Sequence, residues 1–253
     1  MWCYRDGSWR VLPFGAGITG LRRSRSGVWV CTYKGAIHVR GSEIKLYTTG
    51  QVFDKASKFF RAPFEKRLIP DALVDESSFQ ITEVCEEENG FVWFAVNRNS
   101  LIRFDSNKAM NDASAYMQFR HGDNDLLLQN PIRINTSGSG EVWVSSAAGI
   151  FAYDSSSNRW NPCRVPGIKS RTGHEFAFSY RNNALFFALL NHVYIKKGET
   201  WSIVEIPSLQ RSMPHVLEAS DGSLWVGKEQ GKVFRIDQSN EQWATYKNLH
   251  FQC

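Results

Sequence analysis

A short pattern recurs five times along the chain, and it limits the possible folds more than any other feature of the sequence. Each copy places a tight turn, which contains glycine in four of the five copies, before an apolar segment with an aromatic residue at a fixed position, and a polar loop before a second, alternating segment. These aromatic residues, called anchors below, are Trp29, Trp93, Trp143, Phe186 and Trp225. The last two intervals, 43 and 39 residues, are close to the roughly 40–50 residues of a repeat built from four short strands.

The copy at residues 214–246 shows the four strands most clearly. Asp221-Gly222 predicts a tight turn, because Gly tolerates the positive φ that such turns need. The segments 224–226 and 233–236 are short, apolar or alternating, as strands are. A last strand carries a second aromatic residue, Trp243. Four short strands joined by turns predict one antiparallel sheet for each copy.

One such sheet cannot bury both of its faces, but sheets stacked around an axis cover one another. We therefore expect an all-β fold, a β-propeller of four-stranded antiparallel blades with five full blades and a partial sixth. A β-sandwich is the alternative, and it would not hold an aromatic residue at one fixed register. The expected single domain spans residues 1–253: a half blade at 1–12, full blades at 17–50, 79–119, 131–165, 174–206 and 214–246, and an insertion at 51–78.

The two ends of the sequence leave two interpretations open. Residues 1–12 align with the third and fourth strands of a repeat, so the sequence starts in the middle of a blade, and residues 249–253 have the pattern of one more short strand. Either these pieces join into the partial sixth blade and close the ring, or the chain is a fragment of a longer propeller. We favour the fragment, although an open propeller exposes strand edges that promote aggregation.

Composition and charge exclude several classes of protein. Hydrophobic residues make up 42% of the chain, too many for a disordered segment. The longest apolar run, residues 184–190, is too short to cross a membrane, and the N-terminus lacks the apolar core of a signal peptide. The net charge is +5, and its basic residues are spread along the chain. We interpret the charged residues, including the acidic run 86–88, as solvated surface, and expect no nucleic-acid partner and no membrane span.

Motifs for catalysis, metals or cofactors are absent from the sequence. The five cysteines are an odd number without a Cys-x-x-Cys pair, and the six histidines show no metal-site spacing. Residues 121–125 resemble part of a calcium loop but lack its other ligands, so we interpret them as a polar loop. Serine-elbow, phosphate-binding and dinucleotide-binding motifs are missing as well. We expect no catalytic residue, no metal and no cofactor.

The candidate binding residues lie in the loops of one propeller face. The loops from second to third strand and the connections from fourth strand to the next blade share that face, and rigid sheets hold them in place. These loops are polar, mixed in charge and rich in hydrogen-bond donors, which suits a carboxylate, a sugar or an acidic peptide. The candidates are Tyr33, Lys34, Asn97, Arg98, Asn99, Asn191, His192, Lys228 and Glu229 in the loops, and Arg171, His174, Arg211 and His215 in the connections.

The insertion at residues 51–78 is the largest departure from the repeat. It joins a fourth strand to the next blade and carries four phenylalanines among basic residues. Long loops in compact domains are often functional, so one interpretation is a docking element or a lid beside the binding face. The alternative is a short helix, near residues 52–60, that packs its phenylalanines onto the edge of a blade.

Two stretches of the last copy resemble a known repeat family. Residues 221–227 (Asp-Gly-Ser-Leu-Trp-Val-Gly) and 231–237 (Gly-Lys-Val-Phe-Arg-Ile-Asp) resemble the two-component-regulator propeller repeat. The pattern recurs in degraded form at 140–154 and 90–105, while Lys228 stands where the family has Thr and the fourth copy lacks the Gly and Trp. The resemblance implies the extracytoplasmic sensor part of a bacterial regulator, and ligand sensing rather than catalysis.

Two weaker resemblances supply the alternatives. Residues 1–12, with Tyr-Arg-Asp-Gly-Ser-Trp, are similar to tectonin-type lectin repeats, which implies glycan binding. The Gly-x-Val-Trp-Phe and Gly-Lys-Val-x-Arg-Ile pieces resemble streptogramin lyases, which implies a propeller lyase or hydrolase with a histidine, acidic residues and a metal on one face. In that case His174, His192 and His215 would be the candidates for metal ligands or a general base.

These observations favour a non-catalytic, ligand- or partner-binding propeller module. The expected partner is a small molecule, a glycan or a protein on the loop face, and a longer parent protein would supply a kinase domain. The resemblance implies a periplasmic location for a sensor fragment, whereas the absent signal peptide favours the cytoplasm if the chain is complete.

Overall fold

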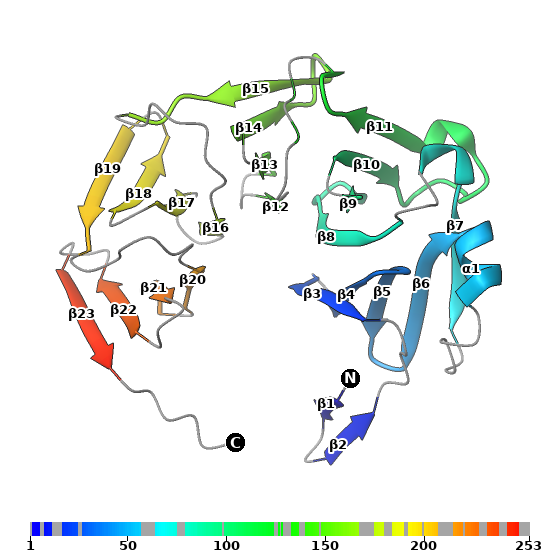
Figure 1. Ribbon diagram of the computed structural model, residues 1–253, viewed down its shortest axis with the longest axis horizontal. Helices are drawn as coiled ribbons and strands as arrows, with labels where there is room; N and C mark the ends of the chain where they lie inside the picture. The colour runs from blue at the N-terminus through cyan, green and yellow to red at the C-terminus, as the bar shows by residue number, and fades with distance from the viewer. Residues whose placement is uncertain are drawn as a thin grey trace. The chain divides into compact units, whose positions relative to one another are not determined.

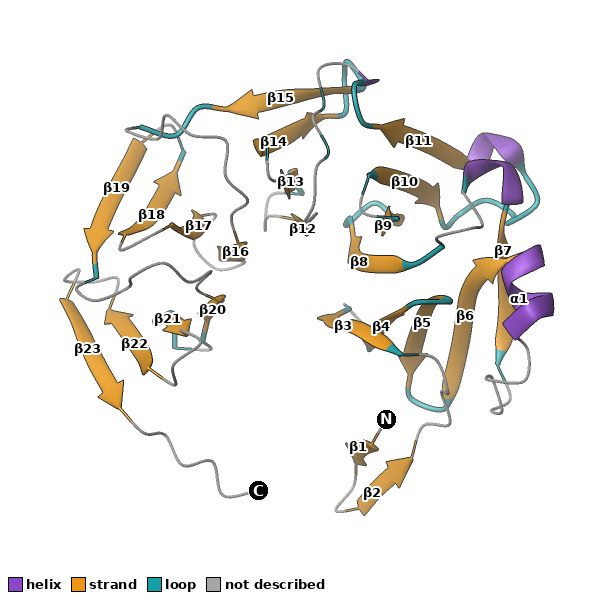
Figure 2. Cartoon of the chain, viewed as in Figure 1, coloured by secondary structure: helices purple, strands orange, loops and turns teal. Residues whose placement is uncertain are grey.

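A computed structural model of the chain describes residues 2–5, 8–11, 17–24, 27–56, 64–74, 79–97, 99–123, 126, 128, 133–136, 140–146, 148–166, 175–179, 184–189, 192–198, 200–206, 215–219, 221–227, 232–237 and 242–247. Strands dominate this part of the chain, and its one α-helix is α1 (Gly50–Ala56) (Figures 1 and 2). An all-β structure is therefore confirmed.

The chain forms two compact units, Met1–His121 and Gly122–Cys253. The strands of the first unit are β1 (Trp2–Arg5), β2 (Ser8–Val11), β3 (Ile18–Arg23), β4 (Val28–Thr32), β5 (Gly35–Arg40), β6 (Glu43–Thr49), β7 (Glu65–Ile69), β8 (Ile81–Glu86), β9 (Phe91–Val96), β10 (Ser100–Asp105) and β11 (Tyr116–Arg120). Its described residues also include α1 and the 3-10 turns η2 (Asp71–Leu73) and η4 (Ala113–Ala115).

The strands of the second unit are β12 (Arg133–Thr136), β13 (Val142–Ser146), β14 (Gly149–Asp154), β15 (Arg159–Cys163), β16 (Glu175–Ser179), β17 (Ala184–Leu189), β18 (His192–Lys197), β19 (Thr200–Glu205), β20 (His215–Glu218), β21 (Leu224–Gly227), β22 (Lys232–Asp237) and β23 (Gln242–Lys247). They form three four-stranded antiparallel sheets, β12–β15, β16–β19 and β20–β23, each with its strands in chain order. The predicted four-stranded repeat is thus confirmed.

The first unit contains a two-stranded sheet (β1–β2), a five-stranded sheet (β3–β7) and a four-stranded sheet (β8–β11). The hairpin β1–β2 agrees with the third and fourth strands expected at residues 1–12. The expected strand at residues 249–253 lies outside the described residues. The bounds of the predicted blades, the closure of the ring and the number of blades stay predictions.

The anchor aromatics share one register, as the repeat predicted. Each anchor lies in the second strand of its sheet and faces one residue of the third strand: Trp29 faces His38, Trp93 faces Arg103, Trp143 faces Ala152, Phe186 faces Ile195 and Trp225 faces Arg235. The glycines of the preceding turns adopt positive φ at Gly90, Gly140 and Gly222. The anchor therefore has the same register in each copy, and a glycine with positive φ precedes it in three of them.

In the first unit the core fills the space between the β3–β7 and β8–β11 sheets. Trp29 and Phe94 are both buried, and their rings meet edge-on with centroids 5.9 Å apart. Burial of an aromatic side chain such as Phe94 stabilises the fold by about 2–3 kcal/mol. In the second unit, Phe186 and Phe234 pack between the last two sheets, and Phe187 stacks on Tyr194 beside Trp143.

The insertion adds a strand that the sequence did not reveal. After β6 the chain forms α1, and the following β7 pairs with β6 in parallel, as the fifth strand of the sheet. Parallel neighbours need a crossover connection, which the segment containing α1 provides. Phe53 of α1 meets Phe64 with ring centroids 6.1 Å apart and packs against the core of this sheet. A short helix is therefore present at residues 50–56 and places one phenylalanine, Phe53, on the sheet, while Phe59 and Phe60 lie outside the described residues.

The acidic run at residues 86–88 was predicted as solvated surface, and this prediction is wrong for Glu87. Its side chain is 5% exposed and accepts a hydrogen bond from the indole Nε1 of Trp93 at 2.6 Å. Arg103 donates to the same carboxylate at 2.8 Å and lies 3.5 Å over the ring of Phe91. A buried carboxylate is tolerated here because it is paired and fully hydrogen-bonded. Only Glu88 of the run is exposed.

Candidate functional site

The structure divides the predicted site residues between the two units. Tyr33, Lys34, Asn97 and Asn99 lie in the first unit, whereas His192 and His215 begin β18 and β20 of the second. The other seven candidates lie outside the described residues: Arg98, Arg171, His174, Asn191, Arg211, Lys228 and Glu229. The site as a whole therefore stays a prediction, and the four candidates of the first unit lie in the loops described next.

Strand register places the two kinds of loop at one edge of the β8–β11 sheet. Ile81 of β8 pairs with Val96 of β9, Val96 pairs with Ser100 of β10, and Ser100 pairs with Arg120 of β11. These residues form one row across the sheet. The β9–β10 loop, the segment before β8 and the end of β11 therefore meet at this edge, which is called the loop edge below.

In the neighbouring sheet, the β4–β5 loop holds Tyr33 and Lys34 in a fixed conformation. The Thr32 hydroxyl accepts a hydrogen bond from the Lys34 amide at 3.1 Å and donates to the Gly35 carbonyl at 2.8 Å. The Thr48 hydroxyl donates to the Lys34 carbonyl at 2.8 Å. Since side chains close both ends of the loop, the backbone is preorganised, and Tyr33 remains 49% exposed.

The β9–β10 loop is fixed in a similar way. Asn97 adopts a φ of +52°, a left-handed conformation that Asn tolerates better than most residues. The backbone N–H of Asn97 donates to the backbone carbonyl of Gln80 at 3.0 Å, and the side-chain oxygen of Asn97 accepts from the backbone N–H of Gln80 at 2.9 Å. This pair of bonds ties the loop to the segment before β8. The exposed side chain of Asn99 follows on the other side of the loop.

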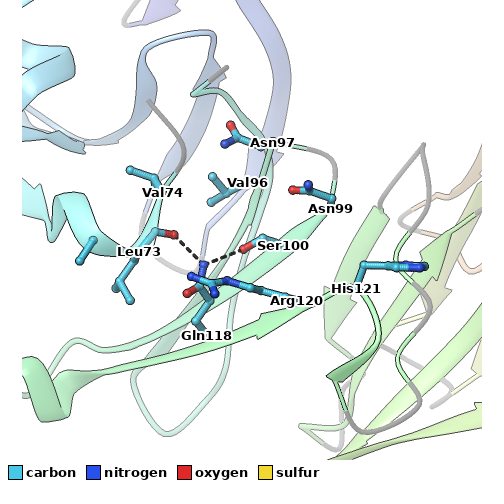
Figure 3. A pocket seen from close by; sticks show the side chains of 10 residues that line it. Leu73, Val74, Val96, Asn97, Asn99, Ser100, Gln118, Arg120 and His121 are labelled. Carbon is cyan, nitrogen blue, oxygen red and sulfur yellow. Dashed lines mark hydrogen bonds between the residues drawn. The ribbon is translucent and has the colours of Figure 1, made fainter. Parts of the chain in front are cut away.

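A pocket of about 380 Å³ opens at the loop edge of the β8–β11 sheet (Figure 3). Its apolar part comes from the end of the insertion and from β9, and its polar part from the β9–β10 loop and β11. The lining residues are Ala72, Leu73, Val74, Val96, Asn97, Asn99, Ser100, Gln118, Arg120 and His121. The pocket thus contains two of the predicted site residues, Asn97 and Asn99.

Gln118 joins the insertion to the sheet inside this pocket. Its Nε2 donates to the carbonyl oxygen of Leu73 at 2.6 Å and to the Ser100 hydroxyl at 3.2 Å, as the dashed lines in Figure 3 show. Because a backbone carbonyl can only accept, this bond fixes which side-chain atom of Gln118 is the nitrogen. The insertion therefore builds a wall of the pocket, and its end is held there by a hydrogen bond to the sheet.

The pocket lining contains cationic and neutral polar groups and no carboxylate. Arg120 and His121 are exposed and lie at the end of β11, whereas Ser100 is buried. In Figure 3, His121 lies to one side, apart from the three carboxamides of Asn97, Asn99 and Gln118. A carboxamide carries both a donor and an acceptor, but here the Nε2 of Gln118 and the Oδ1 of Asn97 already bond to the protein. The arrangement suits a small ligand with hydroxyl or amide groups.

Other polar side chains of the first unit serve the fold rather than an open site. His38 stacks on Trp29 with ring centroids 4.5 Å apart, and its Nε2 lies 2.8 Å from the Ser24 hydroxyl. Burial lowers the pKa of His38, although the nearby Glu86 carboxylate acts in the opposite direction. Glu86 also accepts a hydrogen bond from Trp29 Nε1 at 2.7 Å. Burial likewise raises the pKa of Tyr47 to about 12.

Sequence reasoning missed most of the pocket. Gln118, Arg120 and His121 belong to the end of a fourth strand, and Leu73 and Val74 to the insertion. The sequence did draw attention to residues 121–125, as part of a possible calcium loop, and to the insertion, as the largest departure from the repeat. The alternation of β11 brings every second residue of that strand to the same face, and this pattern could have indicated its pocket residues. Their contact with the insertion depends on how the insertion folds back onto the sheet.

Within the described residues, no cluster of His, Cys, Asp and Glu side chains has a geometry that could hold a metal ion. The described helices include none with the length and apolar character needed to cross a membrane. Cys31, Cys85 and Cys163 are present as thiols in the described part of the chain. Burial raises the pKa of the Cys85 thiol well above its usual value, so it stays protonated at neutral pH.

No protein-family model and no curated protein matches the chain. Solved structures match its fold. A streptogramin B lyase gives a TM-score of 0.63 at 16% identity, over 93% of this chain and 70% of the lyase chain. An extracellular domain assigned to a hybrid two component system of B. thetaiotaomicron gives 0.58 at 13% identity, over 92% of this chain and 30% of that one. YCF48 bound to D1 peptide gives 0.57 at 14% identity, over 92% and 67%.

These matches confirm the predicted β-propeller class. They also include two of the three kinds of protein that the sequence resembles, the two-component extracellular domains and the streptogramin lyases. Identities this low show a shared fold only, so the ligand and the chemistry must be argued from the residues of this chain.

Proposed function

We propose that this chain is a non-catalytic binding module, and that it holds a small polar ligand in the pocket at the loop edge of the β8–β11 sheet. The observation that carries the proposal is the pocket itself, about 380 Å³ with three carboxamides, a hydroxyl and an apolar wall. A concave site with a few convergent polar groups is the usual form of a ligand site. Like the sensor domains that it resembles, the module would report the ligand to another part of its protein.

The preorganisation of the loops supports binding. Hydrogen bonds fix Asn97 to Gln80 and Gln118 to Leu73 before any ligand arrives. A preformed site loses less conformational freedom when the ligand binds, so more of the contact energy remains as affinity. A carboxylate orients the histidine in many catalytic sites, and the lining residues place none beside His121, which favours binding over turnover.

Titration of the full 253-residue chain with a panel of small polar compounds tests the proposal. Suitable members are neutral sugars, N-acetylated sugars, amino acids, dipeptides and dicarboxylates, followed by ¹H–¹⁵N NMR. We expect at least one class to bind with a Kd of about 1 mM or tighter and to shift the amide signals of the β9–β10 loop.

Asn99→Ala should weaken that binding, because the Asn99 side chain lines the pocket and has no hydrogen-bond partner among the described residues. Asn111→Ala is the matched control, since Asn111 is exposed and lies in the connection from β10 to β11, at the opposite edge of the sheet. The proposal fails if no class binds, or if both variants weaken the binding equally.

A lyase is the second candidate, because a streptogramin B lyase and virginiamycin B lyases share the fold. Incubation of the chain with quinupristin, which a solved virginiamycin B lyase structure contains, followed by mass spectrometry, separates the two functions. We expect the compound to remain intact. Turnover that depends on added divalent metal would show that the chain is an enzyme and would overturn the proposed binding function.

A further inference from the structure

We propose that the pocket takes the acetamido group of an N-acetylated sugar, and that a neighbouring ring of the same saccharide stacks on Tyr33. This proposal rests on the proposed function and names its ligand class. It depends on three features of the first unit: the division of the pocket into an apolar and an amide-bearing wall, the exposed ring of Tyr33, and the connection between the two sheets that carry them.

The two walls of the pocket match the two sides of an acetamido group. Leu73, Val74 and Val96 give the apolar side, where a methyl group gains contact without losing hydrogen bonds. Asn99 and Gln118 give the polar side. A site that pairs both the N–H and the C=O of an amide rejects a ligand that lacks them, because its own polar groups are then left without partners.

The side-chain oxygen of Gln118, Oε1, is available to accept a hydrogen bond from a ligand. Both donor contacts of its Nε2, to the Leu73 carbonyl and the Ser100 hydroxyl, lie within the pocket. Among the described residues, none donates to its Oε1. The oxygen is therefore positioned to accept the N–H of an acetamido group. Asn99, which also lines the pocket, supplies a side-chain N–H for the carbonyl.

Tyr33 offers a flat apolar surface on the neighbouring sheet. Part of its ring covers Gly17, where an added Cβ would lie 2.8 Å from Tyr33 Cδ2, yet the residue remains 49% exposed. The closed β4–β5 loop holds it in this position. An exposed tyrosine on a rigid loop supplies contact area at a low cost in conformational entropy, and a ring with an apolar face and hydroxyls at its edge, as in a pyranose, fits such a surface.

Hydrogen bonds and short backbone segments connect the two loops. The Tyr33 amide donates to the Gly17 carbonyl at 3.1 Å, the Thr19 hydroxyl donates to the Ile81 carbonyl at 2.8 Å, and Gln80, next to Ile81, bonds to Asn97 of the pocket. Tyr33 and Asn97 each open the loop after the second strand of their sheet. Packed sheets lie about 10 Å apart, so the proposal requires a saccharide of at least two or three rings to contact both the pocket and Tyr33.

The test compares four probes on the full chain: N-acetylglucosamine, its linear trimer, glucose and cellotriose. Calorimetry or NMR titration gives the affinity of each. We expect N-acetylglucosamine to bind at least about tenfold more tightly than glucose, because glucose leaves amide groups of the pocket unpaired. The trimer should exceed the monosaccharide by roughly three- to tenfold, the range of one aromatic contact.

Two variants separate the two contacts. Tyr33→Ala should reduce the affinity of the trimer to that of N-acetylglucosamine and leave the monosaccharide unchanged, whereas Asn99→Ala should weaken both. Leu21→Ala is the control for Tyr33→Ala, because Leu21 is an equally exposed apolar residue of β3, at 52% exposure, within the strand rather than in the loop. The thermal unfolding of each variant verifies that the sheets are intact.

Each outcome decides the question. Equal affinity for glucose and N-acetylglucosamine overturns the acetamido assignment, and a trimer affinity that Tyr33→Ala leaves unchanged overturns the stacking contact. If another class of the panel, such as dipeptides, binds in an Asn99-dependent way while the sugars do not, the saccharide proposal fails and the proposed binding function stands. If nothing in the panel binds, both fail.

Discussion

Removal of one partner from the buried Glu87–Arg103 pair gives the sharpest test of how the repeat is stabilised. The side chains of Arg103 and Glu87 are 10% and 5% exposed, and their Nε–Oε1 distance is 2.8 Å. The same carboxylate also accepts from Trp93 Nε1 and, at 3.1 Å, from Asn89 Nδ2. Arg103→Met keeps most of the side-chain volume over Phe91 but leaves a buried carboxylate without its cation.

The repeat supplies a matched control at Arg235. This residue faces the anchor Trp225 in β22, as Arg103 faces Trp93 in β10. It forms an ion pair with Asp221 at 3.0 Å, but both side chains are exposed, at 36% and 55%. Solvent screens exposed ion pairs, which contribute little to stability, whereas loss of one partner of a buried pair costs about 3–5 kcal/mol.

Urea unfolding followed by circular dichroism measures the difference. With a slope of about 2–3 kcal/mol per M, Arg103→Met should lower the midpoint by about 1–2 M, while Arg235→Met should leave it nearly unchanged. Hydrogen exchange in β8–β10 places the loss in the sheet that contains the pair. In the double variant Glu87→Leu/Arg103→Met, much of the stability should return, because an apolar pair needs no desolvation of charges.

Equal midpoints for Arg103→Met and Arg235→Met would refute this reasoning. A double variant that is less stable than either single variant would refute it too, since the network would then contribute through its shape rather than through pairing.

Three further predictions concern single positions. Gly35 and Gly149 begin third strands with φ near +140°, but only at Gly35 would a Cβ overlap a backbone atom, the Tyr47 carbonyl oxygen. Gly35→Ala should therefore lower the Tm far more than Gly149→Ala, and equal losses in a thermal scan would contradict this. The lowered pKa of His38 makes the unfolded chain bind more protons, so the stability it contributes is present above about pH 6.5 and is lost as the pH falls through the folded pKa. His38→Gln should reduce the loss of Tm between pH 7.5 and 5.5, and an unchanged loss would contradict the assignment. Hydrogen bonds from Ser157 and Ser156 lower the pKa of Asp154 to about 2; in Ser157→Ala, NMR titration should find the pKa closer to 3.8, and no rise would exclude the hydroxyl as the cause.

The site could be predicted from the sequence only in part. Asn97 and Asn99 were found because polar residues between two alternating strands mark a loop, and the repeat assigns that loop to one edge of its sheet. Gln118 could not be found in this way. Its position in a strand with an alternating pattern indicates only a half-buried side chain, and its bond to Leu73 joins residues 45 apart in the chain. Such contacts depend on the path of the insertion.

The acidic run shows the same limit for charge. A run of three glutamates predicts solvent-exposed side chains, because burial of a charge without a partner is costly. The partners of Glu87 are an arginine in the third strand and an indole in the second, and only the pairing register of β9 and β10 brings them together.

The sequence by itself determined the architecture of each repeat. Alternation, turn glycines and one anchor aromatic act between residues that are close along the chain, so they define four antiparallel strands and their register without any knowledge of the whole. The tertiary structure decided the remainder: the parallel strand β7, the burial of Glu87 and the pocket beside Gln118. These features depend on segments far apart in the sequence, whose meeting is governed by packing and by the satisfaction of buried polar groups rather than by local pattern.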